Sequence, residues 1–243
     1  MRLVLILLIG LSTQGFAQTF HYFRVNMGPK LEYFQVQNAA NLEMLAHIDV
    51  GAGVYIGKRF NEKFSAEVGI VKNDYTARFE INTKNPEGKE LSLFGQSLYP
   101  TYSSYQIAVL GQYRVPINEK WIVYSNVGFH AFLTKNLSRE GILTENEIIY
   151  ANNGDEVDNM ELIYFSNDFE GGNLIFRADL GVYRNITDNL AIDMSISGRA
   201  ASQSISEFTV EYKSNLGASA KNILISNHAA SWGLNLGIKY RIN

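Results

Sequence analysis

The last stretch of the chain decides the fold: residues 231–242 read S-W-G-L-N-L-G-I-K-Y-R-I. Apolar residues alternate with polar or small ones, and side chains in a β-strand point alternately to opposite faces. The stretch therefore predicts a strand with one apolar and one polar face. The apolar face carries Trp232, Leu234, Leu236, Ile238, Tyr240 and Ile242, and the other face carries Ser231, Gly233, Asn235, Gly237, Lys239 and Arg241.

The same alternation recurs upstream. Residues 48–56 alternate isoleucine, valine and alanine with Asp49, Tyr55 and glycines, and residues 190–199 alternate apolar side chains with Asp193 and Arg199. Eight such strands are expected, at residues 20–35, 43–60, 64–80, 101–116, 121–135, 173–186, 190–208 and 225–242. Beyond the N-terminus, no segment approaches the roughly 18 consecutive apolar residues of a membrane helix. The chain is therefore expected to be all-β.

The connections between these strands alternate in length. Residues 61–63, 117–120 and 187–189 form short turns, whereas the other connections are longer and polar, up to residues 136–172. Short turns at one end and long loops at the other are typical of outer-membrane barrels. A soluble barrel would turn its apolar face inward and expose many Lys and Glu, but here the second face is rich in Gly, Ser, Asn, Gln and Tyr. These features predict an antiparallel up-and-down transmembrane β-barrel of eight strands.

The composition fits one domain and excludes several classes of protein. A length of 243 residues suits a single all-β domain. The net charge of −3 offers no basic surface for nucleic acid. Because the chain has no cysteine, disulfide scaffolds, thiolate metal sites and cysteine nucleophiles are excluded.

The N-terminus has the features of a secretory signal peptide. Arg2 precedes an apolar run at residues 3–11, and small residues follow at Gly15 and Ala17. The apolar run is too short to cross a bilayer as a helix. We therefore expect cleavage after Ala17, so that residues 1–17 are the signal peptide and residues 18–243 are the outer-membrane β-barrel domain.

A repeat marks the ends of four of the expected strands. Each contains a glycine followed within two to four residues by arginine, as in residues 111–114 (G-Q-Y-R) and 181–184 (G-V-Y-R). Long aromatic and basic side chains suit the boundary between hydrocarbon and water. The repeat predicts a girdle at the periplasmic end made of Arg59, Tyr113, Arg114, Tyr183, Arg184, Tyr240 and Arg241.

Together, the signal peptide, the eight alternating strands, the tight turns and the final strand resemble the small eight-stranded outer-membrane barrels of the OmpX type and the transmembrane domain of OmpA. The resemblance covers the whole mature chain and implies a place in the outer membrane of a Gram-negative bacterium, among its lipids and lipopolysaccharide. Such barrels usually end in a terminal aromatic residue that the assembly machinery reads. This chain ends Y-R-I-N at residues 240–243 and departs from that pattern.

The polar face of the strands predicts what fills the barrel. With the apolar face toward lipid, the lumen receives Arg24, Asp49, Glu67, Gln106, Asn126, His130, Arg177, Asp179, Asp193, Arg199, Asn235 and Lys239. An eight-stranded barrel is only wide enough for its own side chains. The charged members are therefore expected to form a balanced network that plugs the lumen: Arg24, Asp49, Glu67, Arg177, Asp179, Asp193 and Arg199. A polar conduction path or an acid and base pair is the alternative.

No catalytic residue, metal or cofactor is expected. Among the four histidines, His21 is expected at the periplasmic end, His130 in the lumen, and His47 and His228 near the outer rim. The arrangement nearest to a catalytic one joins His228 with Ser226 or Ser231, but His228 and Ser231 are three residues apart and would face opposite sides of a strand.

The loop at residues 136–172 carries nine acids and one base. The acids Asp155, Glu156, Asp158 and Glu161 do not have the spacing of an EF-hand, which makes a solvated external loop the expectation. A hairpin closed by the turn at residues 152–155 is expected to continue strands five and six outside the membrane.

These expectations combine into a function. The chain is expected to be a non-enzymatic integral outer-membrane protein whose extracellular loops serve surface interaction or envelope integrity. Its partners would be outer-membrane lipids, lipopolysaccharide and an extracellular or secretion-system protein, and not nucleic acid. The alternatives are a narrow pore or accessory barrel of a secretion system, and a barrel enzyme acting on lipid A.

Overall fold

The computed structural model describes residues 21–37, 42–84, 90–92, 101–137, 142–150, 156–167, 174–214 and 219–242. The expected signal peptide at residues 1–17 lies outside the described residues, so its cleavage remains a prediction. Within the described residues, no helix is long and apolar enough to cross a membrane.

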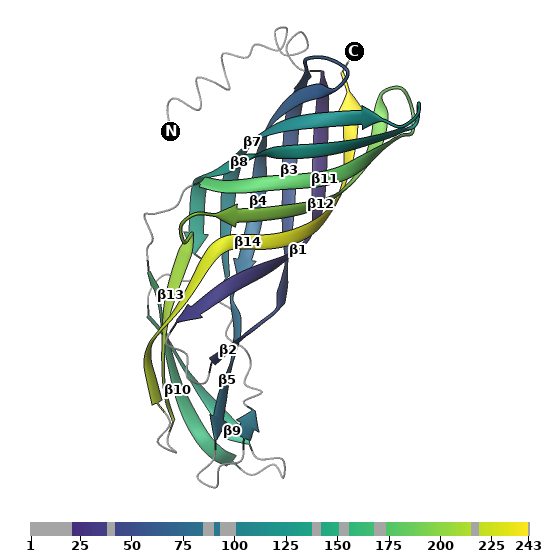
Figure 1. The fold of residues 1–243 in the computed structure, drawn as a ribbon. Helices are drawn as coiled ribbons and strands as arrows, with labels where there is room; N and C mark the ends of the chain where they lie inside the picture. Colours follow the sequence, from purple (N-terminus) through teal and green to yellow (C-terminus); the bar gives the residue numbers. More distant parts are fainter. Residues whose placement is uncertain are drawn as a thin grey trace.

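Eight strands close into an antiparallel barrel (Figure 1). They are β1 (Tyr22–Gln37), β3 (His47–Arg59), β4 (Phe64–Thr76), β7 (Thr101–Pro116), β8 (Trp121–Leu137), β11 (Leu174–Asn185), β12 (Leu190–Ala201) and β14 (Ser219–Arg241). Each strand pairs with the next one in this order, and β1 also pairs with β14, with Tyr22 opposite Arg241. The predicted eight-stranded up-and-down barrel is confirmed.

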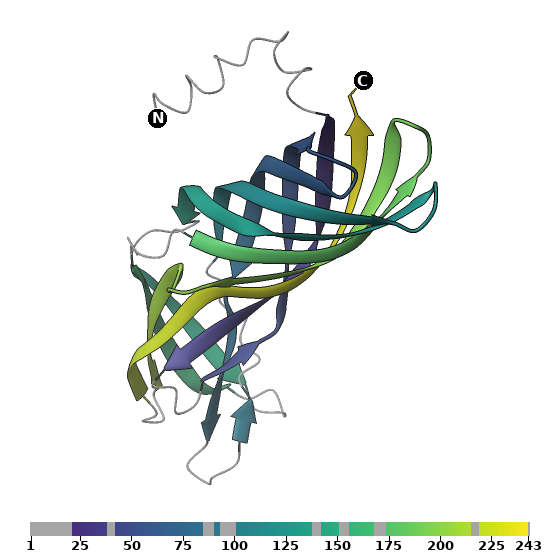
Figure 2. The same ribbon diagram turned by 45° about the horizontal axis from the view of Figure 1, so that its top comes forward.

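Strands outside the barrel extend it at the end opposite the start of β1 and the end of β14 (Figures 1 and 2). The sheet continues from β14 through β13 (Ser206–Ser214) and β10 (Glu156–Asn167) to β9 (Ile142–Tyr150). A separate small sheet contains β2 (Leu42–Leu45), β5 (Arg78–Lys84) and β6 (Glu90–Ser92). We call β9, β10, β13 and the part of β14 that pairs with β13 the outer sheet. The antiparallel pair of β9 and β10 is the predicted hairpin, and its turn at residues 151–155 lies outside the described residues.

Four predicted strands differ from the structure. Those at residues 43–60 and 64–80 are each interrupted, at Ala46 between β2 and β3 and at Ala77 between β4 and β5. The other two differ where the chain enters the outer sheet. The predicted strand at residues 190–208 contains all of β12 and the start of β13, and a break at residues 202–205 separates the two. The predicted strand at residues 225–242 begins six residues late, because β14 starts at Ser219. The last two differences concern residues that pair in the outer sheet beyond the barrel.

The barrel strands keep the predicted faces. Val54, Val127 and Leu236 are between 46% and 64% exposed, whereas the side chains that alternate with them are buried in the lumen. An exposed apolar surface around the whole barrel would be costly in water and is stable against hydrocarbon. The direction of the alternation is therefore that of a membrane barrel.

The polarity of the strands reverses in the outer sheet. On β13, Phe208 and Val210 are buried, while Glu207 and Thr209, which alternate with them, are partly exposed. The facing residue Ile225 of β14 is fully buried as well. Apolar side chains that point inward and polar ones that point outward are typical of a sheet in water. The outer sheet thus has its own small apolar core beyond the lipid-facing part of the barrel.

The three short turns are built alike. Residues 60–64, 117–121 and 186–190 read F-N-E-K-F, I-N-E-K-W and I-T-D-N-L. The side-chain oxygens of Asn61, Asn118 and Thr187 each accept hydrogen bonds from the backbone N–H groups two and three residues further on. Asn and Thr side chains stabilise tight turns in this way. All three turns lie at the end of the barrel where β1 starts and β14 ends, which is the predicted periplasmic end (Figure 1).

Glycines on the lumen face make space for tyrosine rings. A Cβ atom at Gly57 would lie 2.1 Å from the ring of Tyr22, and a Cβ atom at Gly181 would lie 2.5 Å from the ring of Tyr124. Because no real side chain could occupy these positions without moving a ring, glycine is required there. This packing explains why the lumen face is rich in both glycine and tyrosine.

Candidate functional site: the lumen charge network and the periplasmic mouth

Arg24 is the centre of the network in the half of the lumen nearest the turns. Its guanidinium forms an ion pair with Glu67 and a second one with Asp193, where Nη1 and Oδ2 are 3.1 Å apart. It also lies over the ring of Tyr55, 4.4 Å from the centroid. The Tyr124 hydroxyl donates to Asp193 Oδ1 at 2.5 Å. All these side chains are buried, so each charge depends on its partners for solvation.

Arg177 and Asp179 form the next ion pair. They are two residues apart on β11 and therefore share the lumen face, with Arg177 Nε and Asp179 Oδ1 separated by 2.7 Å. Arg177 Nη1 also donates to the Tyr55 hydroxyl at 3.0 Å, and Asn126 Nδ2 donates to Asp179 Oδ2 at 3.1 Å. The first of these bonds links Arg177 to Tyr55, and Arg24 lies over the ring of the same tyrosine.

Two of the predicted network residues bind neutral groups. Arg199 Nη1 donates to the Asn73 side-chain oxygen at 2.5 Å, so its contact is an amide. Asp49 accepts from the backbone and hydroxyl of Thr76 at 2.9 and 2.7 Å, and lies 3.8 Å from His47 Nε2. Within the predicted network, Arg199 is therefore held by an amide and Asp49 by the backbone and hydroxyl of Thr76. Partners of this kind depend on the register between distant strands, which the alternation does not reveal.

One lumen ion pair is absent from the predicted network. Lys30 and Glu32 of β1 are buried and paired, and the Lys30 ammonium lies 3.7 Å from the centroid of the Tyr75 ring. The signal was present in the sequence, because both residues share the parity of Arg24. Pro29 and Leu31 lie on the apolar parity of the same strand, so the alternation is regular here.

Amides and ring hydroxyls join the charged groups. Gln112 Nε2 donates to Asn126 Oδ1 at 2.9 Å and to the Tyr183 hydroxyl at 2.7 Å. Gln106 Oε1 accepts a hydrogen bond from Asn73 Nδ2 at 2.9 Å and lies 3.0 Å from His130 Nδ1. The buried charged residues of the described part of the chain are the bases Arg24, Lys30, Arg114, Arg177, Arg199 and Lys239 and the acids Glu32, Asp49, Glu67, Asp179 and Asp193. The two signs nearly balance, and among the described residues no group of His, Asp and Glu could hold a metal ion.

The predicted girdle is divided between two faces. Tyr113 and Tyr240 point outward, and Arg184 lies 5.5 Å from the centroid of the outward-facing Trp121 ring. Arg114 and Tyr183 are 2% exposed and point into the barrel, so the girdle prediction is wrong for them. Neighbouring residues of a strand face opposite sides, and a Tyr-Arg pair can therefore place only one member on the lipid face.

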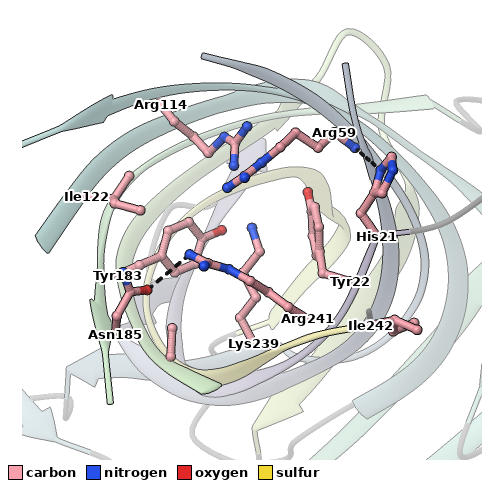
Figure 3. A pocket seen from close by; sticks show the side chains of 11 residues that line it. His21, Tyr22, Arg59, Arg114, Ile122, Tyr183, Asn185, Lys239, Arg241 and Ile242 are labelled. Atoms are coloured by element: carbon pink, nitrogen blue, oxygen red, sulfur yellow. Dashed lines mark hydrogen bonds between the residues drawn. The ribbon is translucent and has the colours of Figure 1, made fainter. Parts of the chain in front are cut away.

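The inward members surround a cavity at the periplasmic end, which we call the periplasmic mouth (Figure 3). It has a volume of about 210 Å³. Its lining includes four basic side chains, Arg59, Arg114, Lys239 and Arg241, together with the rings of Tyr22 and Tyr183. His21 also lines it and accepts a hydrogen bond from the Arg59 backbone N–H at 2.9 Å.

The other predicted residues lie at the opposite end. Glu156, Asp158 and Glu161 are part of strand β10, and Asp155 lies outside the described residues. In β14, His228 is partly exposed and Ser231 is buried. Ala229 between them has a φ of 53° and lies where β14 shifts register against β1. This bulge interrupts the regular strand that the sequence predicts between His228 and Ser231.

Comparisons with known proteins identify the family. No curated protein matches the chain. Among solved structures, Neisserial surface protein A is 10% identical over 90% of this chain and 96% of its own, with a TM-score of 0.39. Ail of Yersinia pestis is 9% identical over 91% of this chain and 99% of its own, with a TM-score of 0.35. Outer membrane protein W of E. coli is 12% identical over 92% of this chain and 98% of its own, also with a TM-score of 0.35. The family model of the outer membrane protein β-barrel domain matches residues 3–206. The chain therefore belongs to the outer membrane protein β-barrel domain family, whose place is the outer membrane of Gram-negative bacteria.

Proposed function

We propose that this protein is a non-enzymatic surface protein, in which a plugged barrel anchors the outer sheet for contact with an extracellular partner. The observation that carries the proposal is the reversal of polarity between the barrel and the outer sheet. A buried apolar core at Phe208, Val210 and Ile225 gives the outer sheet a defined shape in water. A rigid sheet held at a fixed height above the membrane is suited to recognition.

The edge and the charge of the outer sheet indicate the kind of partner. Among the described strands, β9 pairs with β10 alone, so its other edge has no strand partner. Unpaired backbone groups at a sheet edge can accept an extended segment of another chain. Residues 136–172, which include both strands, carry nine acids and one base. We propose that a basic, extended protein segment adds to this edge.

The lumen supports the non-enzymatic part of the proposal. Arg24 and Arg177 are tied to carboxylates, and Arg199 to an amide. Buried charges that are paired in this way stabilise the barrel, because removing one partner of a buried pair is strongly destabilising. The proposal also includes export with cleavage after Ala17, which N-terminal sequencing of the protein from outer membranes would test.

Binding of two designed peptides tests the proposed contact. The protein in lipid nanodiscs is titrated with an immobilised peptide of alternating Lys and Val, and with a second one of alternating Glu and Val. One variant carries Glu156→Gln, Asp158→Asn and Glu161→Gln. The matched control carries three such changes in the periplasmic turns: Glu62→Gln, Glu119→Gln and Asp188→Asn.

The wild type and the turn variant should bind the Lys-Val peptide, and the β10 variant should bind it at least ten-fold more weakly. Equal binding of both peptides, or equal loss in both variants, would overturn the proposal. The rival functions have their own readouts: steady conductance would favour a pore, and a change in lipid A mass on expression would favour an enzyme.

A further inference from the structure

We propose that the periplasmic mouth is a binding site for a phosphate-class oxyanion. The site lies at the opposite end of the barrel from the outer sheet and is independent of the function proposed above. Four basic side chains from three strands reach the same cavity: Arg59 from β3, Arg114 from β7, and Lys239 and Arg241 from β14 (Figure 3). The residues that line the cavity include no Asp or Glu.

The positive charge of the mouth is not neutralised by the protein. Among the described residues, none of the four basic side chains forms an ion pair with a carboxylate. Arg114 donates from Nη2 to the Asn61 carbonyl at 2.8 Å, and its buried Nε has no hydrogen-bond partner. The deeper carboxylates Glu67 and Asp193 are bound to Arg24. Arg114 and Lys239 are buried, and buried cations without a carboxylate partner are costly, so an anion in the cavity would stabilise them.

The basic groups are held in place in advance. The Lys239 ammonium lies 3.5 and 4.2 Å from the centroids of the Tyr22 and Tyr183 rings, and donates to Gln112 Oε1 at 3.3 Å. Arg241 donates to the Asp188 carbonyl at 3.2 Å and to Asn185 Oδ1 at 3.3 Å. A site whose donors are already ordered loses less entropy when it binds a ligand.

Geometry favours a phosphate group over a simple halide. Guanidinium groups present paired donors that match the oxygens of phosphate, and a lysine adds a point charge. A cavity of about 210 Å³ has room for such an anion together with water. Its basic side chains face inward, in contrast to Arg184, which stacks on Trp121 at the outside of the same end. The phosphate could belong to a free anion in the periplasm or to a phospholipid headgroup at the rim, and the chemistry is the same for both.

Titration with sodium phosphate tests this site. The full mature protein is placed in phosphatidylcholine nanodiscs, and binding is measured by calorimetry at constant ionic strength. The test variant is Arg59→Gln with Arg241→Gln, because neither side chain takes part in the deeper ion pairs. The matched control is Arg184→Gln, which removes one charge from the lipid side of the same end.

The wild type and Arg184→Gln should bind phosphate alike, and the double variant should bind at least ten-fold more weakly while unfolding normally. Equal phosphate binding by all three proteins would overturn the proposal. Binding of chloride by the wild type as strongly as phosphate would also overturn it. Repeating the titration in phosphatidylglycerol nanodiscs distinguishes the sources. Weaker apparent phosphate binding there would assign the site to a headgroup, and unchanged binding would assign it to a free anion.

Discussion

Replacing Arg24 with leucine should be the most damaging single change in the lumen. The substitution leaves two carboxylates, Glu67 and Asp193, without their shared cation in a site where all three side chains are at most 1% exposed. Breaking a buried ion pair by removal of one partner costs about 3–5 kcal/mol. Because two acids lose their partner, we expect a loss of about 4–5 kcal/mol, with the Tyr124 hydroxyl still satisfying part of Asp193. Arg177→Leu should cost less, about 3 kcal/mol, because a single acid is stranded.

Urea unfolding in lipid vesicles measures these losses, with the fluorescence of Trp121 and Trp232 as the signal and the heat-modifiable gel shift as a second probe. The triple variant Arg24→Leu, Glu67→Gln, Asp193→Asn removes the whole charged cluster and should recover most of the lost stability. The reasoning would be refuted by an Arg24→Leu barrel as stable as the wild type. It would also be refuted by a triple variant less stable than Arg24→Leu alone.

Three further predictions test other parts of the structure by the same unfolding assay. Leu236→Arg on the lipid face should cost about 2–4 kcal/mol, whereas Ser195→Asn on the lumen face should be nearly neutral, and equal effects would show that the faces are misassigned. Gly181→Ala places a Cβ atom 2.5 Å from a tyrosine ring and should lower the stability by about 1–3 kcal/mol. The control Gly111→Ala, whose Cβ would have its nearest contact at 3.7 Å, should cost almost nothing. A larger loss for Gly111→Ala than for Gly181→Ala would contradict the packing. Asn118→Ala removes both side-chain hydrogen bonds of its turn and should cost about 1–2 kcal/mol. An unchanged stability would mean that the backbone hydrogen bonds to the Trp121 carbonyl suffice to close the turn.

The barrel was predictable because its signal is local. Alternation in residues 231–242 sets the face of every side chain in one strand, and the same pattern in the other strands sets their number. Burial of Asp49, Asp193 and Lys239 follows from this parity alone. The short turns were equally visible, since they lie between two alternating segments.

The outer sheet was harder to predict because an alternating strand can turn its apolar face either outward to lipid or inward to a core. Residues 206–212 alternate as clearly as a barrel strand, yet Phe208 and Val210 point inward where the apolar residues of β12 point outward. The sequence pattern is the same, and what differs is whether lipid or water surrounds the strand. The start of β14 at residues 219–224 shows no alternation, and its pairing with β13 holds it in the sheet.

The partners within the lumen could not be read from one sequence. Arg24 pairs with acids that lie 43 and 169 residues further along the chain, so the choice depends on the register of several strands at once. The girdle prediction is wrong for a different reason. Tyr183 shares the parity of Arg177 and Asp179, so the alternation places it on the lumen face and leaves Arg184 on the lipid face. The basic mouth is the consequence, and neither composition nor spacing indicated it.

Single-channel recording of the purified wild type in a planar bilayer tests the central claim, that the lumen is filled by its own paired side chains. Inserted protein, verified by its heat-modifiable gel shift, should give no steady conductance steps above the bare bilayer. Reproducible steps whose ion selectivity changes in Arg177→Leu, without loss of stability in that variant, would contradict the account and show that the network lines a pore.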